Sequence, residues 1–179
     1  SFGTPEDALG PFAPQPHVDV VHYARRRGCI LVAASGNSGK EERYFPAAMP
    51  EVIAVGAVGE DRHPASFTTR GDHVDLSAPG ASIPTPTVGG YGRASGTSFA
   101  APFVAAAAAL LVAHGARQSA PVSPDMAREI LVGSVRPFPA DARARGCGAG
   151  VLDIPAALNA LRRRVRDDAE RAGEILEVA

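Results

Sequence analysis

The residues Gly96, Thr97 and Ser98 place a serine where its hydroxyl could do chemistry. They follow a glycine-rich stretch, and Ser98 opens the almost wholly apolar run Ser98–Ala113. If that run is a helix, the Ser98 hydroxyl lies at the positive end of the helix dipole, beside backbone N–H groups that can bind a developing anion. This setting suits a nucleophile. The structural alternative is that Ser98 or Thr97 caps the helix, which is the commoner role of an isolated Gly-Thr-Ser.

A second candidate is Asn37, in the turn-forming segment 35–39 that directly follows the apolar run Cys29–Ala34. In open parallel sheets the functional crevice lies at the carboxyl ends of the strands, so an amide here can point into that crevice. A neutral amide can donate to a tetrahedral oxyanion without competing for the catalytic proton. Taken alone, Ser-Gly-Asn-Ser-Gly is more often just a turn.

The elements that must position these residues follow from the spacing of the apolar side chains. The runs Cys29–Ala34 and Val52–Val58 are apolar on both faces, which is typical of buried strands in a parallel sheet. A shorter strand is predicted over Val74–Ala78. A helix over Ser98–Ala113, apolar all round, must be buried. The segment 89–96 before it is predicted to be a glycine-rich loop.

Three further helices complete the prediction. A short amphipathic helix over His17–Arg27 ends in cations. Another begins after the N-cap Ser123, with proline at its first helical position. The charged residues 162–179 are expected to form a solvated helix or tail, held by local charge pairs. The predicted fold class is α/β, a mainly parallel sheet covered by helices on both faces, with residues 1–161 as the main unit.

Composition and charge narrow the classes of partner. Lys and Arg number 18 against 19 Asp and Glu, a net charge of -1, which gives no electrostatic case for nucleic acid or an anionic membrane as the main partner. The apolar stretch Ala105–Ala113 is far shorter than the about 20 residues that span a bilayer, so no membrane segment is predicted. No signal peptide is predicted at the start of the sequence. Cys29 is interpreted as an inert core residue, and a disulfide with Cys147 is not favoured.

Several motifs, in one order along the chain, resemble those of subtilisin-like serine peptidases. The matching segments are Ala33–Asn37, Phe45–Ala47, Val52–Val58, Ala65–Gly71, Asp75–Gly80, Gly96–Pro102 and Gly148–Asp153. The resemblance covers residues 1–161, and several motifs in a fixed order are far more specific than any one of them. It implies a subtilisin-like fold, a polypeptide substrate and peptide-bond hydrolysis by a serine endopeptidase.

The resemblance also implies roles for individual residues. Ser98 matches the nucleophile that forms the acyl-enzyme, and Asn37 matches the amide of the oxyanion hole. Two substrate-binding parts are implied: a strand that pairs with the substrate backbone, and the opposing wall of the pocket for the residue before the scissile bond. The residues are Ser1, Phe2 and Gly3 for the strand, and Ala34, Ser35 and Gly36 for the wall.

Other positions leave alternatives open. Tyr44 falls close to the floor of the specificity pocket that the resemblance implies. If its ring points inward, small residues are preferred before the cut; if not, it is an exposed tyrosine on a charged loop. Ala47, Val52 and Asp75 fall near places where some family members hold a weak calcium ion. Because Met49 lies among them, oxygen ligands are not indicated, and neither a metal site nor a cofactor is expected.

The main departure from the family concerns the acid and the base. The family order is Asp, His and then Ser, and this sequence begins after the positions of the first two. Outside the family's His-Gly-Thr setting, each histidine is interpreted as a surface or capping residue: His17, His22, His63, His73 and His114. Because a serine hydroxyl without a base is a poor nucleophile, the chain alone is expected to have little activity. We expect the N-terminal portion of the domain, with the Asp and His, in a preceding segment or separate chain.

Two classes of function therefore compete. The first is the endopeptidase, completed by a preceding segment, and the second is a non-catalytic pseudoprotease that keeps the peptide-binding groove. An unrelated esterase using Ser98 is disfavoured, because its Gly-x-Ser-x-Gly motif needs a glycine where Ala100 stands. The residues themselves do not indicate a compartment, and only the family resemblance favours secretion.

Overall fold

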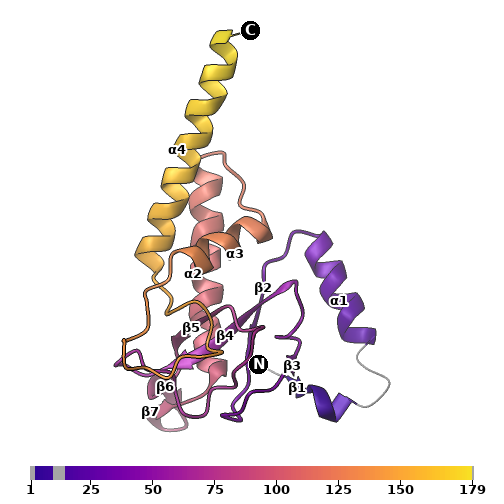
Figure 1. The fold of residues 1–179 in the computed structure, drawn as a ribbon, viewed down its shortest axis with the longest axis vertical. Coiled ribbons are helices and arrows are strands. Elements are labelled where there is room, and N and C mark those ends of the chain that lie inside the picture. Colours follow the sequence, from indigo (N-terminus) through magenta and orange to yellow (C-terminus); the bar gives the residue numbers. More distant parts are fainter. Residues whose placement is uncertain (1–2, 10–14, 179) are drawn as a thin grey trace.

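Strand β4 (Val52–Val58) is the centre of the sheet, and each of its residues is buried. It lies between β2 (Leu31–Ala34) and β5 (Leu76–Pro79) and runs parallel to both. Figure 1 shows this computed structural model, which describes residues 3–9 and 15–178. The predicted parallel sheet is confirmed.

Helices cover both faces of the sheet, as predicted. The helices are α1 (Gln15–Arg26), α2 (Thr97–Arg117), α3 (Pro124–Gly133) and α4 (Ile154–Val178). On one face α2 packs against all three strands, with α3 and α4 beside it. On the other face α1 places Val21 against Met49 and Val52. Because side chains alternate along a strand, β2 contributes Val32 to the first core and Leu31 to the second.

Two small antiparallel pairs lie outside the parallel sheet. They are β1 (Thr4–Pro5) with β3 (Tyr44–Phe45), and β6 (Ile83–Thr87) with β7 (Gly90–Ala94), and the 3-10 helix η1 (Glu6–Leu9) follows β1. The glycine-rich loop predicted over residues 89–96 is therefore wrong in part, because residues 90–94 form β7. Most side chains of this hairpin are exposed, so no hydrophobic alternation marks it in the sequence.

Strand β2 is half-buried, contrary to the prediction of a buried strand. Within the described residues it pairs with β4 alone, so its other edge has no partner strand there. The strand begins at Leu31, and Cys29 lies exposed before it, so the prediction that Cys29 is a core residue is wrong. Cys147 is buried, which raises the pKa of its thiol, and both cysteines are free.

Helix α2 is buried along one side only, although its sequence predicted burial all round. Ala100, Val104 and Leu111 are buried, whereas Phe103 and Leu110 are exposed. The helix has 21 residues and is longer than its purely apolar stretch, so by length and composition alone it could cross a membrane. In this fold it packs against β2, β4 and β5.

The C-terminal helices form where the sequence predicts them. The Ser123 side chain caps α3, accepting a hydrogen bond from the Met126 N–H at 3.2 Å. Helix α4 buries Leu161 and then projects away from the body (Figure 1). Arg164 of this helix pairs with Glu129 of α3 at 2.8 Å. The division placed after residue 161 falls inside one continuous helix.

Candidate active site

Ser98 is the second residue of α2. The N-cap of the helix is Gly96, with no side-chain capping bond, so the interpretation of Ser98 or Thr97 as the cap is wrong. Gly96 is itself fixed, because its N–H donates to the carbonyl of Gly80, just after β5, at 2.8 Å. The Ser98 hydroxyl therefore belongs to the first turn of a long helix, where the backbone dipoles favour negative charge.

The Asn37 side chain is held by the start of the same helix. Its Oδ1 accepts hydrogen bonds from the Thr97 backbone N–H at 2.8 Å and from the Thr97 Oγ1 at 2.9 Å. A backbone N–H can only donate, so the oxygen of the amide must face Thr97. The Asn37 nitrogen is therefore the end of the amide that these bonds leave available, and Asn37 and Ser98 line one cavity together.

Thr97 is a site residue that sequence reasoning missed. It is fully buried, and its Oγ1 also lies 3.2 Å from the carbonyl oxygen and 3.3 Å from the backbone nitrogen of Gly36. Its place beside Ser98 is the only signal in the sequence, where it is interpreted as a cap. Its observed role is to join α2 to the loop that carries Asn37.

A cavity of about 390 Å³ brings together most of the predicted site residues. The residues that line it are Gly3, Ala34, Gly36, Asn37, Ser38, Tyr44, Thr97 and Ser98. Ser35, also implied as substrate-binding, does not line it, because its buried Oγ donates instead to the Thr69 carbonyl at 3.0 Å. Ser1 and Phe2 lie outside the described residues.

Tyr44 lies in β3 and lines this cavity, which is the inward alternative of the two left open by the sequence. It is half-buried, and its Cδ2 would lie 2.9 Å from a Cβ added to Gly36. The ring therefore packs against the backbone of Gly36, and no residue larger than glycine fits at position 36 without a shift. A preference for small residues before the cut stays a prediction.

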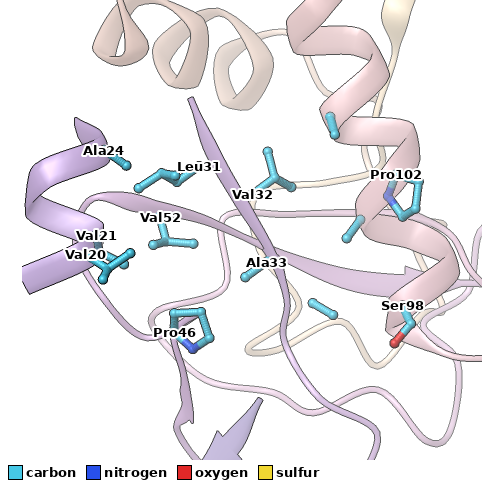
Figure 2. Close-up of a pocket in the computed structure, with 13 residues that line it drawn as sticks. Val20, Val21, Ala24, Leu31, Val32, Ala33, Pro46, Val52, Ser98 and Pro102 are labelled. Carbon is cyan, nitrogen blue, oxygen red and sulfur yellow. The ribbon is translucent and has the colours of Figure 1, made fainter. Parts of the chain in front are cut away.

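Ser98 also borders a larger apolar cavity, shown in Figure 2. Its volume is about 590 Å³, and α1, β2 and α2 supply most of its walls. Val20 and Val21 of α1 lie at one end, while Ser98 and Pro102 of α2 lie at the other (Figure 2). The serine thus stands where a small polar cavity meets a large apolar one.

The histidines lie elsewhere in the described structure. Across the described residues, the lining of the two cavities that Ser98 borders includes no histidine, aspartate or glutamate. Three histidines have polar partners among other residues, which include Glu51 for His22 at 3.0 Å, Asp141 for His63 at 3.2 Å and Gln118 for His114 at 2.7 Å. The side chain of His73 is 6% exposed, so its interpretation as a surface or capping residue is wrong; burial, followed by the charge of Arg43, lowers its pKa. The His17 side chain lies outside the described part.

Asp75, one of the positions matched to a weak cation site, is bound by groups of the protein. Its carboxylate accepts hydrogen bonds from Arg128 Nη2 at 2.7 Å and from the Ala54 backbone N–H at 2.9 Å. Arg128 also donates to the carbonyl of Pro50. In the part of the chain that is described, no three or more His, Cys, Asp or Glu side chains gather as around a metal. A guanidinium is thus the cation beside this carboxylate.

A serine in the first turn of a helix, beside an oriented amide at the end of a parallel strand, is a site typical of serine hydrolases. The family model described as the subtilase family, Peptidase_S8, matches residues 1–150. The chain belongs to the subtilase family, and its fold is subtilisin-like. The resemblance in the sequence is thereby confirmed.

This chain matches only part of the length of its curated relatives. The chain is 45% identical over 98 residues to a thermophilic serine proteinase of Bacillus sp. (strain AK1), covering 54% of this chain and 24% of that protein. It is 41% identical over 99 residues to thermitase of Thermoactinomyces vulgaris, covering 53% of this chain and 34% of that protein. The chain therefore spans well under half the length of these two relatives.

Solved structures extend the match to most of the chain. The self-cleaved protease domain of PatA superposes with a TM-score of 0.78 at 36% identity, covering 90% of this chain and 60% of that domain. The prenylagaramide maturation protease PagA gives a TM-score of 0.74 at 31% identity, covering 80% of this chain and 54% of that protease. The chain thus corresponds to little more than half of each solved protease.

Proposed function

We propose that this chain is the C-terminal part of the catalytic domain of a subtilisin-like serine endopeptidase. The observation that carries the proposal is the pair of hydrogen bonds from Thr97 to Asn37 Oδ1, at 2.8 and 2.9 Å. These bonds fix the orientation of the Asn37 amide, so that its nitrogen can donate a hydrogen bond in the cavity that Ser98 also lines. A donor fixed before the reaction begins costs no reorganisation when the oxyanion forms.

The chemistry assigns one step to each residue. Ser98 Oγ attacks the peptide carbonyl carbon, and its proton passes to a base. The carbonyl oxygen becomes an anion, which accepts hydrogen bonds from Asn37 Nδ2 and the Ser98 backbone N–H. The amine leaves with that proton, and water then releases the acyl group from Ser98 by the same steps in reverse.

The Asp and His of this mechanism come from a segment or chain that precedes the sequence. The described cavities around Ser98 hold no acidic or histidine side chain that could serve. The share of the solved proteases that the chain covers, 60% and 54%, leaves room for such a segment. This chain by itself is then close to inactive, because its serine lacks a base.

The open edge of β2 is where the preceding segment packs in this proposal. Strand β2 is half-buried and, in the described structure, pairs on one side only. Apolar cavities of about 590 and 610 Å³ flank it, and both share Leu31 and Val32 in their walls. An added strand would pair with the free backbone groups, and its side chains would fill these apolar spaces.

The substrate is a polypeptide, with a small residue before the scissile bond. Tyr44 supports this preference, because it lines the cavity and its ring lies against Gly36. Replacing Tyr44 by Ala should raise kcat/KM for peptides with a large residue at that position relative to those with alanine. Equal changes for both peptides would show that Tyr44 does not set the preference.

The second candidate is a pseudoprotease that binds peptides in the same groove without cutting them. The cavities around Ser98 favour it to the extent that the described lining lacks a base. This alternative predicts peptide binding that Ser98→Ala leaves unchanged, together with no covalent labelling under any condition.

Intact-mass analysis after treatment with a fluorophosphonate tests the proposal. The chain is labelled alone and with the preceding segment encoded before residue 1, supplied in cis or added in trans, each beside Ser98→Ala. We expect one adduct with the segment present, little without it, and none in Ser98→Ala.

Each other outcome has a definite meaning. An adduct on the chain alone, lost in Ser98→Ala, would show that a base lies within this chain and would overturn the proposed origin of the His. Folded protein that never forms an adduct, with or without the segment, would support the pseudoprotease.

A further inference from the structure

Thr69 contacts the residues on both sides of Asn37. It lies between β4 and β5 in the chain and is 0% exposed. Its backbone N–H donates to the Gly36 carbonyl at 2.9 Å, and its Oγ1 accepts from the Ser38 N–H at 3.1 Å. The residues immediately before and after Asn37 are therefore both bound by one threonine.

Two more contacts join Thr69 to the loop that carries Asn37. The Ser38 hydroxyl lies 3.0 Å from Thr69 Oγ1, and the Ser35 hydroxyl donates to the Thr69 carbonyl at 3.0 Å. The loop also lies close to the threonine, since a Cβ added to Gly36 would meet Thr69 Oγ1 at 2.7 Å. Gly36 has a φ of +113°, a conformation open mainly to glycine. The backbone at Asn37 thus has little freedom to move away from Thr69.

We infer that Thr69 is a positioning residue for the oxyanion, holding the backbone of Asn37 while Thr97 holds its side-chain oxygen. The inference rests on the proposed function of Asn37. Thr69 does not itself line the cavity of Ser98, so it acts through Asn37 and not by touching the substrate. Because stabilisation of an oxyanion depends on donors fixed at the right place, freeing the loop should lower kcat more than it changes KM.

Thr68 provides a matched control. It is the same residue type, is also 0% exposed, and its Oγ1 also accepts a backbone hydrogen bond, from the Ala57 N–H at 2.9 Å. That bond belongs to β4 and not to the Asn37 loop. Thr68→Val and Thr69→Val each replace one buried hydroxyl by a methyl group of nearly the same size. A purely structural effect on stability would therefore be similar in both variants.

The first test uses nuclear magnetic resonance on this chain, at a concentration where light scattering shows a single monomeric species, and needs no activity. We expect Thr69→Val to shift or broaden the signals of the Asn37 side-chain amide and the Ser38 N–H. Thr68→Val should leave both unchanged, and Thr69→Ser, which keeps the hydroxyl, should restore them. Thr69→Ala is the second variant if the added methyl of valine prevents folding. Wild-type Asn37 signals in folded Thr69→Val or Thr69→Ala would overturn the inference.

The second test measures hydrolysis by the chain completed with its preceding segment. Thr69→Val should lower kcat by about tenfold with KM changed by less than about twofold, and Thr69→Ser should recover most of the rate. In an Asn37→Ala background the same change should cost little, because the donor it positions is gone. Equal losses of kcat in Thr68→Val and Thr69→Val, or a full loss in the Asn37→Ala background, would overturn the inference. Hydrolysis that survives Ser98→Ala would instead refute the proposed function, and leave the resonance test to decide on Thr69.

Discussion

Gly80 and Gly96 lie in close contact at the end of the sheet, through one hydrogen bond and through tight packing of their backbones. The Gly96 N–H donates to the Gly80 carbonyl at 2.8 Å, and the Gly96 carbonyl oxygen would lie 3.0 Å from a Cβ added to Gly80. The same Cβ would come within 2.7 Å of the Ala57 side chain. The absence of a side chain at residue 80 therefore allows the start of the helix that carries Ser98 to pack this closely against the end of the sheet.

Gly80→Ala should lower the free energy of unfolding by about 1–3 kcal/mol, because the added methyl overpacks a closed contact. Urea unfolding followed by circular dichroism measures the change. Gly133→Ala is the control, since a Cβ there would meet nothing within 4 Å and the position lies in α3. That variant should be neutral or gain up to about 1 kcal/mol. Equal stability of both variants would refute the close contact.

Arg128→Met should lower the free energy of unfolding by about 2 kcal/mol, because it leaves the largely buried carboxylate of Asp75 without its ion-pair partner. The cost is limited because Arg128 is itself partly exposed. The side chain of Asp75 is 11% exposed and that of Arg128 is 36% exposed. Adding Asp75→Asn to Arg128→Met should recover part of the loss, because the unpaired charge is removed. Simple addition of the two single losses in the urea midpoint would contradict a direct coupling.

The buried His73 should make the protein less stable in acid. Burial, then the charge of Arg43, lowers its pKa below the ordinary 6.5, while Asp72, Asp75 and Glu6 act in the opposite direction. The unfolded chain therefore takes up a proton that the folded chain resists. The free energy of unfolding should stay level for this group above pH 6.5 and fall as the pH drops below that value.

Urea unfolding of wild type and His73→Gln at about pH 7.5 and about pH 5.5 measures this effect. The wild type should lose more stability between the two conditions than His73→Gln does. His22→Gln is the control, because the His22 side chain is 43% exposed. A pH dependence that His73→Gln leaves unchanged would assign the effect to other groups.

Asn37→Asp separates the two ends of the Asn37 side chain. Aspartate can still accept both hydrogen bonds from Thr97, so the loop should stay in place. It has lost the donor and adds a negative charge beside the developing oxyanion. In the completed protease kcat should fall by about 100-fold or more, with the thermal midpoint little changed. Activity near that of wild type would show that Asn37 does not donate to the reacting oxygen.

Much of the fold could be predicted because its apolar runs are distinct. Val52–Val58 is uniformly apolar and is the buried central strand, and Ser123 caps the helix that it precedes. The β6–β7 hairpin escaped prediction because exposed strands leave no apolar pattern. The exposed side of α2 was not predicted because its side chains are apolar, and an apolar side chain in a helix is normally expected in the core. Only the structure shows that β2 forms an open edge of the described sheet.

Within the candidate site, the sequence could locate Ser98 and Asn37 but not the residues that hold them. Thr97 holds the Asn37 side-chain oxygen and Thr69 holds the backbone beside it, each through hydrogen bonds between distant parts of the chain. No spacing within the sequence records such contacts. For the same reason Ser35 could not be told apart from its neighbours, although its hydroxyl turns inward to Thr69.

The open edge of β2 also bears on how this chain behaves when it is made by itself. A strand that pairs on one side only within the described residues, set between apolar cavities, is a template on which another copy of the same strand can pair. We therefore expect the isolated polypeptide to self-associate as its concentration rises. Light scattering across a dilution series would register this association.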